Sequence, residues 1–236
     1  SKYATSEELE SGVKLLNNLS SELDILRPNM LYTALEVVQF NHNRKAANLQ
    51  FFEWGKTYST KATGQYAEQS HFCLYLTGQT GASSWKGKGA AADVYYLKGV
   101  VESILKMCGL QNIAFEADNA NAQFSTALKA VINGQALVQL GQVAPKMAAA
   151  FDIKMPVFVA DFNWDGLLKY RSGQKITYKP LPKYPAVERD LALVVPRQTP
   201  YSQISSVVKS LRLQKLQDLK LFDVFESEKL GADKKS

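Results

Sequence analysis

A loop of glycine and lysine residues is the first segment of this sequence whose residue types could bind a phosphate. Residues 82–89 read Ala-Ser-Ser-Trp-Lys-Gly-Lys-Gly. A phosphate-binding loop has a glycine, four residues, Gly-Lys and then a Ser or Thr whose hydroxyl contacts magnesium. Ala82 stands at the position of the first glycine and Gly89 at the position of the hydroxyl. We therefore interpret the segment as a surface loop and not as a nucleotide site.

Acid–base and metal chemistry have few candidate residues. Glu53 lies between two aromatic residues and could be a carboxylate in a cleft, but no partner acid is near it in the sequence, so we interpret it as structural. The two histidines, His42 and His71, lie in segments for which a structural role is the better interpretation, so no Ser-His-Asp arrangement is indicated. No His/Cys group has the spacing of metal ligands. We expect no catalytic residue and no metal ligand.

Basic residues gather in the last third of the chain and could contact phosphates. Residues 165–236 contain 14 Lys and Arg against 8 Asp and Glu, a net charge of +6, whereas residues 1–164 contain 14 of each. Such residues form a solvated face in many proteins and neutralise nucleic-acid phosphates in others, and the sequence leaves both open. Tyr178, Tyr184 and Phe222 could stack on unpaired bases, although packing in a core or an interface is the role we favour for them.

The composition is that of an ordinary globular chain. With 236 residues, of which 46% are hydrophobic, it can bury a sizeable core in one or two domains. No apolar run approaches the roughly 20 residues of a membrane helix, and the N-terminus lacks the apolar core of a signal peptide. Cys73 and Cys108 are expected to be buried free thiols, which indicates a cytoplasmic protein.

Hydrophobic periodicity predicts an α+β fold with a largely antiparallel sheet. A peripheral helix is expected over residues 1–18. The clearest helices are expected over residues 28–43, with Pro28 in the first turn, and over residues 94–108, ended by a left-handed Gly109.

Strands alternate with these helices. They are expected over residues 49–54, stopped by Gly55, and over residues 71–77, 124–132, 135–140 and 156–162. The dipeptide Asn133-Gly134 tolerates positive φ at both positions, and so predicts a two-residue hairpin.

The last third begins with a proline-containing segment. Its three prolines hold the chain extended, and Arg189-Asp190 either forms an ion pair that anchors this entry or offers Arg189 to RNA. Leu191 to Val195 are expected to form a strand buried on both faces. A helix capped by Thr199, with Pro200 at its first position, and a strand over residues 219–225 should follow. These elements make an incomplete small domain. The expected division is therefore residues 1–165, a connector over 166–189, and residues 190–236.

Several motifs occur in one consistent order from residue 18 onwards. They are Asn18-Leu-Ser-Ser-Glu-Leu-Asp-Ile-Leu-Arg-Pro-Asn-Met-Leu31, Asn41-His-Asn-Arg44, Leu49-Gln-Phe-Phe-Glu-Trp-Gly55, Asp93-Val-Tyr-Tyr-Leu-Lys-Gly99, Pro182-Lys-Tyr-Pro-Ala-Val-Glu-Arg-Asp190 and Leu221-Phe-Asp-Val-Phe225. Together they resemble the β subunit of bacterial phenylalanyl-tRNA synthetase. The last two motifs are similar to the opening of that family's ferredoxin-like anticodon-binding domain.

This resemblance implies a class II aminoacyl-tRNA synthetase-like antiparallel sheet with helices over residues 1–165, without an active site. An incomplete ferredoxin-like domain would follow it. Class II catalysis uses arginines that hold the phosphates of ATP. By the family comparison, one would stand on the strand that here reads Phe51-Phe-Glu-Trp54, and another in a Gly-x-Gly-x-Glu-Arg string that this sequence lacks. Residues 120–127 and 141–145 depart from the family pattern, so no role is carried over to them.

The resemblance also implies partners. The chain would be a non-catalytic structural and tRNA-binding part of the β subunit, supporting aminoacylation of tRNA(Phe) by a heterotetramer of α and β subunits. No cofactor is expected in this chain, whereas the parent complex would use ATP and Mg²⁺. The candidate α-subunit contacts are Leu26, Arg27, Leu31 and Leu35. The candidate tRNA contacts are Lys183, Arg189, Lys209, Arg212, Lys215 and Lys220.

Two other functions stay open. A free-standing ligase derived from a class II synthetase would need a pocket in which Arg and Glu side chains converge. A generic RNA-binding module would bind RNA in a salt-dependent way, without preference for the phenylalanine tRNA.

Overall fold

The structure, a computed structural model, describes a chain that divides into two compact units, Ser1–Thr177 and Tyr178–Ser236. No helix in the described part is long and apolar enough to cross a membrane. The described residues are 5–17, 24–62, 64–81, 84–85, 87, 89–110, 113–172, 178, 183–227, 230–231 and 233–236.

The first unit is built on one six-stranded antiparallel sheet with the strand order β1-β2-β6-β5-β4-β3. The prediction of an α+β fold with a largely antiparallel sheet is confirmed. The strands are β1 (Leu49–Ala62), β2 (Gln65–Thr77), β3 (Ala114–Ala117), β4 (Phe124–Ile132), β5 (Gln135–Val143) and β6 (Val157–Asn163). The helices are α1 (Ser6–Glu10), α2 (Leu31–His42), α3 (Val94–Met107), α4 (Pro145–Ala150) and α5 (Trp164–Ser172).

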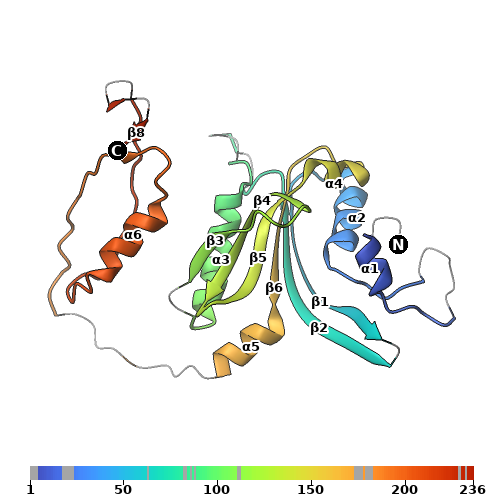
Figure 1. The fold of residues 1–236 in the computed structure, drawn as a ribbon. Coiled ribbons are helices and arrows are strands. Elements are labelled where there is room, and N and C mark those ends of the chain that lie inside the picture. The colour runs from blue at the N-terminus through green and yellow to red at the C-terminus, as the bar shows by residue number, and fades with distance from the viewer. Residues whose placement is uncertain are drawn as a thin grey trace. The chain divides into compact units, whose positions relative to one another are not determined.

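A separate apolar core lies on each face of this sheet. On one face, Leu35 and Val38 of α2 pack in a cluster with Tyr75 of β2. On the other face, Val101 of α3 packs in a cluster with Phe162 of β6. Figure 1 shows α2 and α3 on opposite sides of the strands. Strands β2 and β6 lie between the two cores, so their side chains are buried on both faces where the helices cover the sheet. This burial explains the nearly continuous hydrophobic runs of the two strands.

The two clearest predicted helices are present, and one begins later than predicted. Helix α3 starts after Asp93, whose side chain accepts a hydrogen bond from the Tyr96 N–H at 2.7 Å, and Gly109 follows it with a φ of 83°. Helix α2 begins at Leu31 and not at Pro28. The N-cap residue is Met30, and Oδ1 of Asn29 before it accepts from the N–H of Leu31 at 3.0 Å and from that of Tyr32 at 3.3 Å, which satisfies two free N–H groups of the first turn.

The N-terminal helix is shorter than predicted. Within residues 5–17, the described part of this segment, the helix covers only Ser6–Glu10. The chain then forms a bridge between Lys14 and Ile25. A five-residue helix is too short to be stable alone, and a reciprocal capping box between Thr5 and Glu8 stabilises it.

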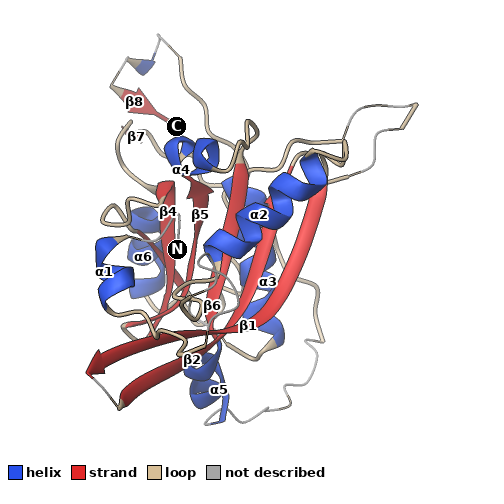
Figure 2. Cartoon of the chain, turned by 90° about the vertical axis from the view of Figure 1, so that its right-hand side faces the viewer, coloured by secondary structure: helices blue, strands red, loops and turns tan. Residues whose placement is uncertain are grey.

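Gly55 does not end the first strand, contrary to our expectation. Strand β1 continues to Ala62 and forms a long hairpin with β2, which Figure 2 shows extending beyond the other strands. A Cβ atom at Gly55 would lie 2.2 Å from Nη2 of Arg27 and 2.6 Å from Cε of Met30. The glycine therefore lets these two side chains lie against the sheet. Its place in the sequence reflects this close approach and not the end of a strand.

The predicted hairpin between β4 and β5 is confirmed. Asn133 and Gly134 have φ values of 49° and 79°, the pair of positive angles that a type I′ turn requires. The turn pairs Ile132 with Gln135, and a register shift between Ala130 and Val131 then places Lys129 of β4 opposite Gln139 of β5.

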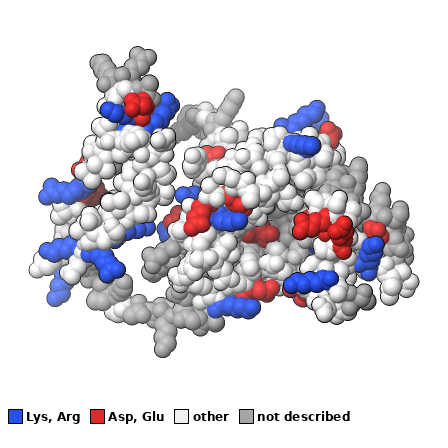
Figure 3. All heavy atoms as spheres, viewed as in Figure 1, with Lys and Arg blue, Asp and Glu red and all other residues white. Residues whose placement is uncertain are grey.

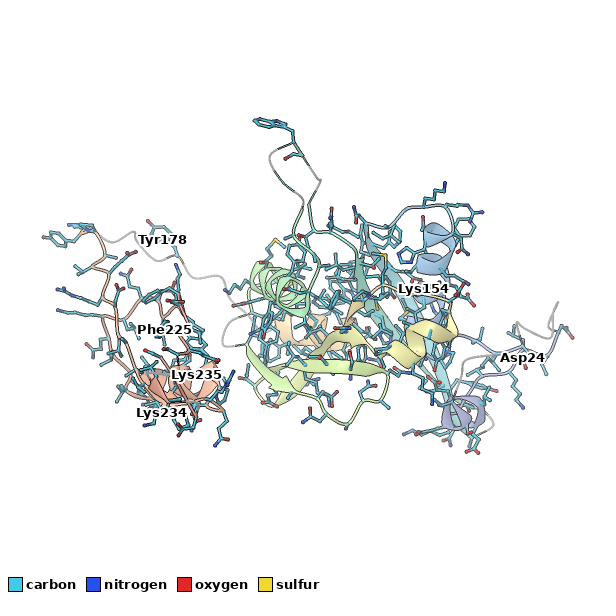
Figure 4. All side chains as sticks on the ribbon, turned by 90° about the horizontal axis from the view of Figure 1, so that it is seen from above. Asp24, Lys154, Tyr178, Phe225, Lys234 and Lys235 are labelled. Atoms are coloured by element: carbon cyan, nitrogen blue, oxygen red, sulfur yellow. The ribbon has the colours of Figure 1, made fainter. Side chains whose placement is uncertain are left out.

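The second unit contains helix α6 (Tyr201–Ser210) and a short antiparallel pair, β7 (Val195–Pro196) with β8 (Lys234–Lys235). Beside this pair, the N–H of Phe225 donates to the carbonyl of Ser236 at 2.6 Å, and the N–H of Ser236 donates back at 2.8 Å. Figure 4 shows Phe225 near Lys234 and Lys235.

Of the strand that we predicted over Leu191–Val195, only Val195 lies in a strand, β7, and the strand predicted over residues 219–225 is not formed. Residues 190–194 and 219–225 lie outside the strands of the described chain, and their apolar side chains are exposed, with Leu191 at 69% and Phe222 at 74%. A strand needs a neighbouring backbone and a covering layer. Backbone partners are found for residues 195 and 196 in the strand pair and for Phe225. Within the described residues, no layer of helix or sheet covers the apolar side chains of the two predicted strands.

The start of α6 also differs from the prediction. The N-cap residue is Pro200, one position after the predicted Thr199, and the helix start has no side-chain cap hydrogen bond. The Arg189–Asp190 ion pair is absent from the ion pairs of the described residues, and both side chains are exposed. The anchoring ion pair, one of the two alternatives given above for these residues, is therefore not seen.

Candidate partner and nucleic-acid interfaces

A row of polar residues crosses the whole sheet on the face that α2 partly covers. Each member is the direct register partner of the next, from β1 to β3. Side chains that face each other across strands interact as pairs. The row is Glu53, Cys73, Asp161, Gln139, Lys129 and Glu116.

Arg27 closes the β1 end of this row. Its Nη1 lies 2.6 Å from Oε1 of Glu53, and its Nε donates to the backbone carbonyl of Lys56 at 3.3 Å. Glu53 thus has a cationic partner, which the sequence did not reveal because the two residues are 26 positions apart. The pair holds the segment before α2 against the first strand.

The centre of the row is a hydrogen-bonded cluster of three strands. Nδ1 of His71 lies 2.7 Å from Oδ1 of Asp161, and Nε2 of the same ring lies 2.9 Å from Oγ1 of Thr57. The thiol of Cys73 donates to the same Oδ1 at 3.3 Å. Burial, together with the nearby Asp161 carboxylate, raises the pKa of the Cys73 thiol far above its ordinary value, so Cys73 is a protonated thiol here.

Asp118 organises the other end. Its carboxylate is almost completely buried, lies 3.1 Å from Nζ of Lys129 and accepts from Nε2 of Gln139 at 2.7 Å. Burial by itself would raise the pKa of Asp118, but the hydrogen bonds from Lys129 and Gln139 and the charge of Lys129 outweigh it and hold that pKa below its ordinary value.

We expect this carboxylate to make the first unit sensitive to acid. A group whose pKa is lower in the folded state stabilises the fold above its unfolded pKa of about 3.9, and that contribution is lost as the pH falls through the folded value. Asp118→Asn should lower the free energy of unfolding by about 1–3 kcal/mol at neutral pH, because Lys129 and Gln139 lose a charged acceptor. The substitution should also make the free energy of unfolding fall less steeply with decreasing pH below pH 4. Urea unfolding at several pH values measures both.

The exposed Asp152 provides the control for that change. It has a φ of 57°, which asparagine tolerates well, so Asp152→Asn should alter the free energy of unfolding by less than about 0.5 kcal/mol. Equal effects of the two variants would contradict the role given to Asp118.

The arrangement of charge on this face does not suit a nucleotide. In the described chain, Arg27 is held by Glu53 and Lys129 by Asp118, so the cations of the row are already neutralised. Asp161 and Glu116 add further negative charge. A triphosphate needs cations aimed at its oxygens, and the residues here do not fit ATP.

The glycine-containing loop gives no phosphate site in its described part. Ser84 and Gly87 bridge each other through their backbones, and Trp85 between them is 91% exposed. Residues 82, 83, 86 and 88 lie outside the described residues.

The predicted α-subunit contacts fall in two environments. Leu31 and Leu35 are buried in the core under α2, with 6% and 0% exposure, so their side chains pack within this chain. Leu26 and Arg27 are partly exposed and lie beside β1. Only the latter two offer surface to another protein.

An aromatic patch on the opposite face was missed by sequence reasoning. Phe52 and Trp54 of the edge strand β1 are 69% and 52% exposed. Their rings lie 6.2 Å and 4.4 Å from that of Phe72, and Trp54 also meets Trp164 at 4.3 Å. Exposed apolar patches of this kind mark interaction surfaces. The signal in the sequence was the alternation of aromatic residues around Glu53, in a segment that we interpreted only as a strand stopped by Gly55.

The predicted tRNA contacts all lie in the second unit and are exposed. Lys220 lies 3.3 Å from a carboxylate oxygen of Asp218, and Arg212 follows α6 with a φ of 47°. Figure 3 shows Lys and Arg side chains scattered over the visible face of this unit and not gathered in one patch. The six residues are Lys183, Arg189, Lys209, Arg212, Lys215 and Lys220.

Comparison with known protein families shows which family each part of the chain matches. Residues 1–164 match the family described as the phenylalanyl tRNA synthetase beta chain CLM domain, and residues 182–236 match the ferredoxin-fold anticodon binding domain. The chain belongs to the phenylalanyl-tRNA synthetase β-chain family.

Curated relatives from this β-chain family are similar along nearly the whole chain. The phenylalanine–tRNA ligase β subunit of Bacteroides thetaiotaomicron is 38% identical over 234 residues, which is 95% of this chain and 28% of the relative. The β subunit of Porphyromonas gingivalis is 33% identical over 237 residues, 96% of this chain and 29% of the relative. The chain thus spans less than a third of the length of these relatives.

Solved structures support the class II synthetase fold of this β-chain family member. The crystal structure of pyrrolysyl-tRNA synthetase from Desulfitobacterium hafniense matches with a TM-score of 0.56 and 14% identity, covering 73% of this chain and 58% of that one. A structure of PylSc, a pyrrolysyl tRNA synthetase from the same organism, matches with a TM-score of 0.54 and 16% identity, covering 72% and 55%. At these identities the likeness concerns the fold alone.

Proposed function

We propose that this chain is a non-catalytic structural and tRNA-binding part of a phenylalanine–tRNA ligase β subunit. In this role it supports aminoacylation of tRNA(Phe) by an assembly of α and β subunits in the cytoplasm. The observation that carries the proposal is the combination of family membership with a sheet face whose cations are neutralised by carboxylates. Such a face supplies shape and contacts, while the chemistry belongs to another subunit.

The parent assembly would use ATP and Mg²⁺, but this chain would not bind them. Adenylate formation develops negative charge that fixed cations must meet. Here Arg27 and Lys129 are already engaged by acids, and the β1 strand carries Phe52, Glu53 and Trp54. The engagement of these cations by acids also disfavours a free-standing ligase, which would need Arg and Glu side chains converging on a substrate.

A direct consequence concerns catalysis. The purified chain should show no phenylalanine-dependent exchange of pyrophosphate into ATP above the background without enzyme. The control is an intact phenylalanine–tRNA ligase measured under the same conditions. Exchange by the chain alone would contradict the proposal, as would an adenylate bound to the first unit.

The α subunit would bind surfaces that the described chain leaves exposed. Leu26 and Arg27 remain candidates, whereas Leu31 and Leu35 are replaced in the proposal because they are buried. The outer side of α2 offers Val37 and Phe40, which are 48% and 54% exposed.

The tRNA would contact the second unit. Its residues carry most of the excess positive charge, its match is to an anticodon-binding domain, and its six candidate Lys and Arg side chains are exposed. Because a basic surface alone binds any RNA, preference for tRNA(Phe) over an unrelated tRNA at the same salt concentration separates this function from generic RNA binding.

A further inference from the structure

We propose that His71, Cys73 and Asp161 form a binding site for a single zinc ion on the sheet face that α2 partly covers. In the described chain, these three residues form a group of His, Cys and Asp side chains whose ligand atoms all lie within 4.8 Å of one another. The site goes beyond the proposed function, which does not need it.

The sheet itself brings the three groups together. His71 and Cys73 are two positions apart on β2, so their side chains lie on the same face. Asp161 is the register partner of Cys73 on β6. The spacing search in the sequence missed the group because the third ligand is 88 positions from the cysteine.

The distances are close to those of a zinc site. Nδ1 of His71 and Sγ of Cys73 lie 2.7 Å and 3.3 Å from the same oxygen, Oδ1 of Asp161. Tetrahedral zinc, with its usual bond lengths, would set these separations at about 3.4 Å and about 3.6 Å. These two pairs would therefore move apart by less than about 1 Å, while Nδ1 of His71 and Sγ of Cys73, which lie within 4.8 Å of each other, would come to about 3.6 Å, and side-chain rotation can supply both changes.

Metal binding would displace protons from the hydrogen bonds of this group without leaving a polar atom unpaired. The Cys73 thiol would lose its proton to water on binding the metal. An imidazole that binds the metal through Nδ1 carries its proton on Nε2, where Oγ1 of Thr57 lies 2.9 Å away and can accept it. A hydroxyl donates or accepts by rotation, so Thr57 holds the ring in either state, as an outer-shell partner does in metal sites.

The ligand set favours zinc over harder cations. A thiolate and an imidazole select zinc, whereas magnesium and calcium prefer oxygen ligands alone. One thiolate and one carboxylate balance the double charge of the ion. The Asp161 side chain is 34% exposed, which leaves room for water as the fourth ligand, while Cys73 is completely buried.

Cobalt substitution tests the site. The untagged 236-residue chain is titrated with Co²⁺, which occupies zinc sites and reports sulfur ligation by a thiolate-to-cobalt absorption band in the near ultraviolet. We expect that band at one equivalent, its loss on adding one equivalent of Zn²⁺, and one zinc per chain after dialysis. Cys73→Ser should remove the band, and Asp161→Asn should weaken Co²⁺ binding by at least about ten-fold.

Cys108→Ser is the matched control, since Cys108 is the other cysteine of the chain and lies at the end of α3. It should leave the band and the stoichiometry unchanged. If circular dichroism shows that Cys73→Ser does not fold, Asp161→Asn decides the matter, because its side chain is partly exposed and keeps its size. An unchanged affinity in Asp161→Asn, a missing band in the unmodified chain, or a band that Cys108→Ser removes would each overturn the proposal.

Discussion

Phe162→Ala is expected to lower the free energy of unfolding of the first unit by about 3–5 kcal/mol. Phe162 is 0% exposed and lies on β6, between β2 and β5 in the sheet. Its ring lies 5.3 Å from that of Phe72 and packs in the cluster beneath α3. Removing the ring leaves a cavity that rigid strands on both sides cannot close. Urea unfolding followed by circular dichroism gives the value.

Phe52→Ala is the control for this change, since it removes the same side chain from the same sheet. Phe52 is 69% exposed on the edge strand β1, so the expected loss is below about 1 kcal/mol. A large effect at Phe52 would mean that the aromatic patch is a core in solution. A small effect at Phe162 would contradict the packing described for the α3 face.

Removal of four basic residues from the second unit is expected to weaken tRNA(Phe) binding by about 10- to 100-fold at about 0.1 M salt. Each phosphate contact contributes about 0.7 to 0.9 to the slope of the logarithm of affinity against the logarithm of salt concentration, so the slope should fall by about 3 to 4. Filter binding at several salt concentrations measures both quantities. The substitutions are Lys209→Gln, Arg212→Gln, Lys215→Gln and Lys220→Gln.

A matched variant of the first unit controls for net charge. It also loses four exposed lysines, and so has the same total charge, but it should bind tRNA(Phe) within about two-fold of the unmodified chain, because the proposed phosphate contacts all belong to the second unit. Equal weakening by both variants would indicate that net charge alone drives binding. The matched substitutions are Lys45→Gln, Lys61→Gln, Lys146→Gln and Lys154→Gln.

The sequence was most reliable where a local rule acts alone. The turn at Asn133-Gly134 was predicted correctly because positive φ is a property of those two residues. The C-terminal end of α3 followed in the same way from Gly109. Where a distant residue intervened, prediction failed. Gly55 was taken for a strand end, although it makes space for Arg27 and Met30.

The surfaces were harder to predict than the helices and strands. Two of the proposed α-subunit contacts, Leu31 and Leu35, are apolar because they form this chain's own core. The aromatic residues Phe52 and Trp54, predicted to be an ordinary strand segment, are exposed. Periodicity identifies an apolar face but does not say which apolar face remains uncovered, since that depends on which elements pack against it.

The sequence by itself determined the fold class, the family and the division of charge between the two parts of the chain. Those properties follow from residue types, short spacings and motif order, all of which can be read from the linear sequence. Only the tertiary structure decided that Arg27 and Lys129 are neutralised by Glu53 and Asp118, and that His71, Cys73 and Asp161 meet. Strand register creates these contacts between residues far apart in the chain, and register is fixed by the packing of the whole sheet.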